Sequence, residues 1–189
     1  MYRLGLVSII LSLTIFLSCS NNSTDSDVLD VGEGIGSFTV TGDVEAEREG
    51  VSYFTVTRSD GDLLGIRIHI EKAHPLDRDD SYNSDYSFTL LADKDGEPFT
   101  LTTGTYEIGL LSDDNLAFAG VYTHRISADV VNGYQSADQG GSITISSSSD
   151  EMIQASFEFK AIDYGDGAEE DKVVTISGEF TSKCFGPSC

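Results

Sequence analysis

The sequence predicts an all-β domain, an antiparallel β-sandwich of about 9-10 short strands, with a closed or partly open β-barrel as the alternative. From Gly36 onward, apolar residues recur with a period of two, which is the spacing of a strand with one buried face. No segment beyond the N-terminal apolar run carries an apolar repeat of helical period, so no helix is expected there. Asp-Gly pairs, such as Asp60-Gly61 and Asp95-Gly96, indicate tight turns between the strands.

The first part of the domain contains a series of runs with one apolar face each. In chain order these faces consist of Phe38 and Val40; Phe54 and Val56; Leu64, Ile66, Ile68 and Ile70; Tyr86, Phe88 and Leu90; and Tyr106, Ile108 and Leu110. The third run is the clearest, because Arg67, His69 and Glu71 occupy its other face. The segment Leu116–Ile126 has apolar residues on both faces, which predicts a central strand.

The last third of the chain has the most regular alternation. Its apolar faces consist of Ile143 and Ile145; Ile153, Ala155, Phe157, Phe159 and Ala161; and Val174, Ile176, Gly178 and Phe180. A polar turn is expected over Ser146–Glu151. The pattern therefore predicts a strand, a turn and two longer strands at the end of the domain.

The N-terminus resembles the export signal of a bacterial lipoprotein. A basic start, Met1–Arg3, precedes the apolar run Leu4–Leu17 and then Ser18-Cys19. The run is shorter than the about 20 residues that a membrane-spanning helix needs, so it predicts a signal peptide over 1–18. The resemblance implies that Cys19 is acylated with palmitate after cleavage. An ordinary secretory peptide, with Cys19 incidental, is the alternative.

Together, this start and the last three runs resemble a family of uncharacterised exported β-rich lipoproteins of Bacteroidota-type bacteria. The resemblance implies an exported all-β lipoprotein and supplies no catalytic residue. The polar stretch Ser20–Asp30 and the glycine-rich Gly32–Gly36 predict a lipidated, disordered tether over 19–35, followed by a single all-β domain over 36–189. Ser20 after the acylated cysteine implies release to the outer membrane, and the pattern leaves the periplasmic and the surface-facing side both open.

The three cysteines support the lipid interpretation. An odd thiol is a liability in an oxidising compartment, and acylation of Cys19 leaves the pair Cys184 and Cys189. Gly186 and Pro187 between them favour a tight turn, so a disulfide is predicted. Closing so short a loop contributes about 2 kcal/mol by the chain-entropy relation.

The net charge of −21 excludes two classes of partner. Nucleic acid phosphates would be repelled, and so would an anionic membrane surface, which leaves the covalent lipid as the membrane anchor. Acidic clusters at Asp77–Asp80, Asp93–Glu97 and Asp163–Asp171 offer oxygen ligands for calcium, and a calcium-stabilised adhesion domain is one alternative function. Solvated loops explain these clusters better, so no metal and no cofactor is assigned.

Catalytic patterns are absent from the sequence. Its three histidines are His69, His74 and His124, and no Gly-x-Ser-x-Gly, His-Glu-x-x-His or phosphate-binding loop accompanies them. A hydrolase that uses paired carboxylates stays as an alternative because acidic residues are abundant.

The segments Lys72–Ser84 and Ser127–Gly140 predict long loops, which often carry binding sites. Their tyrosines, Tyr82 with nearby Tyr86 and Tyr134, are the candidate ligand-binding residues for a glycan or a protein, and capping of the sheet core is the alternative. The sequence as a whole predicts a lipid-anchored envelope protein that acts as a non-catalytic binding or interaction module.

Overall fold

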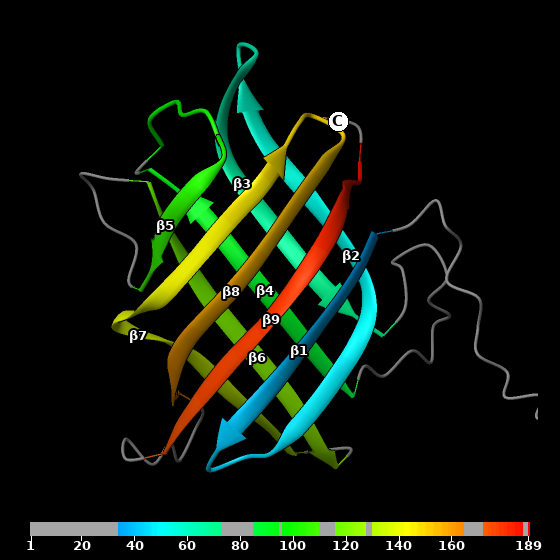
Figure 1. Ribbon diagram of the computed structural model, residues 1–189, viewed down its shortest axis with the longest axis vertical. Helices are drawn as coiled ribbons and strands as arrows, with labels where there is room; N and C mark the ends of the chain where they lie inside the picture. The colour runs from blue at the N-terminus through cyan, green and yellow to red at the C-terminus, as the bar shows by residue number, and fades with distance from the viewer. Residues whose placement is uncertain are drawn as a thin grey trace, which may run out of the picture.

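The computed structural model describes residues 34–72, 85–94, 96–109, 116–127, 130–164, 172–186 and 189. Within these ranges the chain forms nine strands and one closed barrel (Figure 1). The strands are β1 (Gly34–Gly42), β2 (Ala46–Ser59), β3 (Asp62–Glu71), β4 (Tyr86–Asp93), β5 (Gly104–Ile108), β6 (Ala117–Ser127), β7 (Val130–Ser148), β8 (Met152–Asp163) and β9 (Val173–Cys184). The all-β prediction is confirmed. The sandwich is wrong, and the closed barrel given as its alternative is correct.

The barrel closes because the first and last strands pair with each other. β1 lies between β2 and β9 and is antiparallel to both, over Gly34 to Val40 on the β2 side and Ile35 to Gly42 on the β9 side. The other neighbours follow chain order, except that β4 pairs with β6 and β5 is inserted between β6 and the second half of β7. Closure removes the two free edges that an open sheet would expose.

From Val130 onward the predicted loop Ser127–Gly140 is a strand, so that expectation is wrong for the described part of the segment beyond Ser127. β7 runs through it and bends between Ser136 and Gly141, where its register with β8 shifts. The buried Ser136 hydroxyl donates to the Gly109 carbonyl (2.7 Å) and accepts from the Gly120 N–H (3.1 Å), which holds the bend in place. Small and polar residues are common both in loops and at bends in strands. The composition of this stretch therefore cannot distinguish the two.

The barrel interior is filled with side chains. The apolar side chains predicted to face inward on β1, β3, β4, β8 and β9 are almost completely buried in the core, with one exception. Leu64 of β3 was expected on this face, but it is skipped at a β-bulge in the pairing with β2, and Leu63 packs against the core instead. Phe88 lies at the centre, with its ring centroid 4.9 Å from those of Phe38 and Phe157. A barrel of about eight strands is just wide enough for side chains to fill, and the buried side chains described above fill this nine-stranded one as a packed core.

The C-terminal end of β9 extends past the start of β1 and pairs in parallel with β2, at Tyr53↔Lys183 and Phe54↔Cys184. Just beyond it, the Phe185 N–H donates to the Phe54 carbonyl (2.7 Å). The predicted disulfide between Cys184 and Cys189 is present, with the two Cα atoms 5.6 Å apart. It fastens the chain end to the barrel beside β2.

Cys19, the signal peptide and most of the tether lie outside the described residues. β1 begins at Gly34, two positions before the expected domain start at residue 36. Among the described residues, no helix has the length and apolar character needed to cross a bilayer.

Candidate functional site

The two ends of the barrel differ in chemistry. The upper end in Figure 1 carries the β2–β3 and β7–β8 turns, and the lower end carries the β1–β2 and β6–β7 hairpins. Because β2 runs from the lower to the upper end, its early residue Arg48 and its late residue Phe54 belong to opposite ends.

The upper end opens into a depression of about 430 Å³ with both apolar and polar side chains in its lining, which we call the upper mouth. Its lining consists of Phe54, Val56, Arg58, Gly61, Asp62, Leu63, Ile66, Phe99, Thr100, Leu101, Ser148, Ser149, Asp150 and Ile153. The floor is buried core, whereas Val56, Leu63 and Phe99 are only partly buried and pack against that core. The size lies within the range of small-molecule sites, and barrel mouths are a common position for them.

The hairpin turn at Asp60-Gly61 shapes one side of the upper mouth. Both residues have positive φ, 53° and 92°, as a type I′ turn requires, which confirms the turn predicted there. The Phe99 N–H donates to the Leu63 carbonyl (3.0 Å), and this bond holds the Phe99 segment against β3.

One ion pair spans the rim of the upper mouth. Arg58 Nη2 lies 2.9 Å from Asp150 Oδ1, and Arg58 Nη1 donates to the Gly61 carbonyl (3.3 Å). The Asp150 side chain is 86% exposed and that of Arg58 is 31% exposed. Exposed pairs of this kind contribute about 0 to 1 kcal/mol, so the rim can open at little cost.

The lower end holds a polar group of residues inside the barrel wall, which we call the lower cluster: Arg48, Tyr86, Tyr122, His124 and Tyr134. Arg48 pairs with the inward-facing Phe38, so its side chain points inward as well. Its guanidinium carbon lies 5.5 Å from the centroid of the Tyr86 ring, and its Nη2 lies 3.4 Å from His124 Nδ1. Tyr122 Oη lies 3.1 Å from the same His124 nitrogen.

Burial shifts the titration of the lower cluster. It is the main cause that lowers the pKa of His124, and the positive charge of Arg48 lowers it further. Burial raises the pKa of Tyr122, although the charge and hydrogen bonding of Arg48 act the other way. His124 is therefore a neutral imidazole and Tyr122 a neutral phenol near pH 7.

Tyr134 is completely buried and its ring stacks on Tyr122, with centroids 6.2 Å apart. Burial raises its pKa, and the negative charge of Asp163 adds to the effect. Asn132 acts on that pKa in the opposite direction, but no described residue forms a hydrogen bond of good geometry with the Tyr134 hydroxyl.

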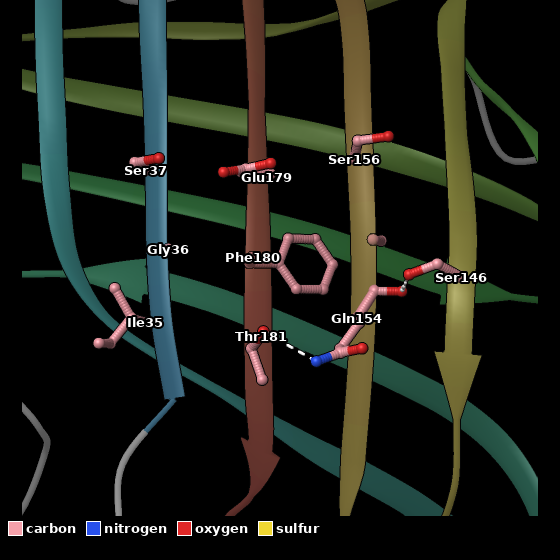
Figure 2. Close-up of a pocket in the computed structure, with 10 residues that line it drawn as sticks. Ile35, Gly36, Ser37, Ser146, Gln154, Ser156, Glu179, Phe180 and Thr181 are labelled. Atoms are coloured by element: carbon pink, nitrogen blue, oxygen red, sulfur yellow. Dashed lines mark hydrogen bonds between the residues drawn. The ribbon is translucent and has the colours of Figure 1, made fainter. Parts of the chain in front are cut away.

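A polar groove of about 500 Å³ follows the outer wall over β1, β9, β8 and β7 (Figure 2). Ser37, Glu179 and Ser156 form a row across three strands in it. Below the row, Gln154 Nε2 donates to Thr181 Oγ1 (3.4 Å), so part of its polar lining is already paired. The aromatic ring nearest to it, Phe180, is buried at 4% exposure and offers no stacking surface.

Comparison of the chain with protein-family models, with curated proteins and with solved structures finds no match. A fold by itself does not specify a function, because the same barrel architecture can carry unrelated sites. Any functional assignment therefore rests on the residues of the barrel ends and the outer groove.

The structure places two of the three candidate tyrosines in the lower cluster. Tyr86 and Tyr134 are 5% and 0% exposed and point into the barrel, on either side of Tyr122. Tyr82 lies outside the described residues, as does His74. The burial agrees with the core-capping alternative for Tyr86 and Tyr134.

Sequence reasoning missed both arginines of the barrel ends. Arg48 lies in the charged stretch Glu47–Glu49, which gives no sign of a buried position. Its inward orientation follows only from the register with Phe38, which the sequence does not reveal. Arg58 lies on the same face of β2 as Phe54 and Val56, since the extra residue of the nearby β-bulge is Leu64 of β3, but a charged residue at the end of a strand gives no sign of a binding site.

Two further polar residues of the described ranges, His69 and Glu71, contact Tyr53. His69 stacks on Tyr53 with ring centroids 4.8 Å apart. Glu71 is the buried acid in the described part of the chain, and it accepts a hydrogen bond from the Tyr53 hydroxyl (3.0 Å). The close pair of buried carboxylates that the hydrolase alternative requires does not occur in those ranges, nor does a group of three metal-ligating side chains.

Proposed function

We propose that the protein is a non-catalytic binding protein of the bacterial cell envelope that takes one small amphipathic ligand into the upper mouth. The supporting observation is the pairing of an apolar floor with a charged rim. Val56, Leu63 and Phe99 are incompletely covered, and Arg58 lies directly beside them. A ligand that covers these side chains removes apolar surface from water, at about 25 cal/mol per Å².

The rim indicates the polar part of the ligand. The Arg58 guanidinium can receive a carboxylate in bidentate geometry, and the exposed Asp150 side chain is free to move away into solvent. The ligand is therefore an apolar chain with an anionic head, such as a medium-chain fatty acid. The outer groove suits such a ligand less well, because part of its polar lining is already paired and its ring, Phe180, is buried.

Laurate is a suitable probe of the upper mouth. We expect saturable laurate binding by calorimetry, weakened about tenfold or more in Arg58→Gln because a charge-assisted bidentate pair is lost. Leu63→Gln is expected to weaken binding as well, since it places a polar group on the apolar wall. The matched control is Arg67→Gln. This substitution also removes one positive charge, but Arg67 is exposed on the outer face of β3, away from the upper mouth.

Laurate affinities that are equal in the wild type, Arg58→Gln and Leu63→Gln would show that the ligand does not bind in the upper mouth. Equal weakening in Arg58→Gln and Arg67→Gln would instead mean that only net charge matters. Each result rejects the proposed site.

The cell-envelope part of the proposal rests on the N-terminal signal. We expect radiolabelled palmitate to enter the wild-type chain and not Cys19→Ser, because the thiol is the acylated group. Cys19→Ser should also move from the membrane fraction to the soluble fraction. Palmitate incorporation that survives the substitution, or none in the wild type beside a labelled control lipoprotein, contradicts the anchor.

A further inference from the structure

The lower cluster contains a cation without a matching anion. Arg48 has no carboxylate within ion-pair distance among the described residues, in a chain with 32 acidic and 11 basic residues. Asp85, the carboxylate whose charge acts on His124, is paired with Lys72 at 3.1 Å. A partly buried charge is normally compensated by an opposite charge, so the lack of one here calls for an explanation.

The contacts that Arg48 does make leave donors unused. Nη1 donates to the Glu47 carbonyl (3.0 Å) and Nη2 lies near His124, but Nε is buried and forms no hydrogen bond with any described residue. Unsatisfied buried donors are rare in proteins, so the unused Nε indicates a place for an acceptor beside Arg48.

The histidine adds a further donor. Both groups near His124 Nδ1, the Arg48 guanidinium and the Tyr122 hydroxyl, can donate to it. Nδ1 is then the acceptor, and the neutral ring carries its proton on Nε2. The cluster therefore presents the Arg48 guanidinium and the His124 imidazole N–H, because the Tyr86 hydroxyl donates to the Glu49 carbonyl (2.8 Å) and the Tyr122 hydroxyl to His124 Nδ1.

We propose that the lower cluster is a second binding site, which takes a small oxyanion, a carboxylate or phosphate group, on the Arg48 guanidinium. The planar fork of an arginine matches two oxygens of either group. The Arg48 guanidinium lies over the Tyr86 ring, and this contact restricts its position before the ligand arrives. Arg48 and His124 are only partly buried, which leaves the ligand a path from solvent.

This site is independent of the proposed upper mouth. The two lie at opposite ends of the barrel and share no lining residue. An outcome for laurate at Arg58 therefore neither supports nor weakens the oxyanion site at Arg48.

Inorganic phosphate is the probe, titrated at constant ionic strength while the side-chain N–H signals of arginine are followed by NMR. We expect the Arg48 Nε–H signal to shift saturably, and the affinity to fall about tenfold or more in Arg48→Met, which keeps the aliphatic stem and removes the fork. Arg67→Met removes the same charge from the outer face and should leave the affinity unchanged.

Arg48→Lys covers the case in which Arg48→Met does not fold, because it keeps the charge and loses the bidentate geometry; we expect it to bind phosphate more weakly than the wild type. A wild-type Arg48 signal that phosphate does not move overturns the site. So does phosphate binding that is equal in Arg48→Met and the wild type, or equally weakened in Arg48→Met and Arg67→Met. Acetate tested in the same way separates a carboxylate site from a phosphate site.

Discussion

Gly178→Ala is expected to destabilise the barrel by about 3 kcal/mol, at the upper end of the usual cost of overpacking. Gly178 lies on the inward face of β9, directly opposite Phe38 on β1 and Phe157 on β8. A Cβ atom at this position would lie 2.2 Å from the Ser37 carbonyl oxygen and 2.7 Å from Phe38 Cβ. Since the nearest atom belongs to the backbone, the strand pairing itself has to shift. Urea unfolding followed by circular dichroism measures the loss.

Gly65→Ala is the matched control for this substitution. Gly65 is also a buried strand glycine, but a Cβ there would meet its nearest neighbours at 3.7 Å, which is an ordinary contact. We expect its free energy of unfolding to change by less than about 1 kcal/mol, because alanine also restricts the unfolded chain. Similar losses in both variants would mean that Gly178 is not required by the close approach of β1.

For most strands, the sequence alone is sufficient to predict which side chains face the barrel interior. Alternation in β3, β4, β8 and β9 predicts the inward residues, apart from Leu64 at the β-bulge of β3, because a two-residue period has only one solution when a single face is apolar. It could not distinguish a sandwich from a barrel. That choice depends on the pairing of β1 with β9, which lie at the two ends of the domain, and alternation within a strand carries no information about its neighbours.

The candidate sites were harder to predict for the same reason. The upper mouth exists only once the β2–β3 and β7–β8 turns meet at one end of the closed barrel. Tyr134 was assigned to a loop because glycine and polar residues surround it, whereas it lies on a bent strand with its ring inside. Arg48 is flanked by glutamates, and only its register with Phe38 shows that it points inward.

Phe88→Ala tests whether the interior and the upper mouth have separate roles, as the structure indicates. Phe88 is fully buried and its ring packs against Phe38, Phe157 and Phe159. Its truncation should lower the free energy of unfolding by about 3 to 5 kcal/mol, since the transfer term and the cavity term both apply. Laurate affinity, measured by calorimetry on the folded variant, should stay close to that of the wild type, because Phe88 does not line the mouth.

Phe99→Ala is the counterpart at the upper mouth. Phe99 is only partly buried, and its backbone bond to Leu63 does not depend on the side chain, so its truncation should cost about 1 kcal/mol of stability. The substitution removes apolar surface from the lining of the upper mouth. Laurate affinity should therefore fall about tenfold, equivalent to about 1.4 kcal/mol. The opposite result would be laurate binding that is lost in folded Phe88→Ala and kept in Phe99→Ala. It would place the ligand inside the barrel, because binding would then depend on a core residue and not on a residue that lines the mouth.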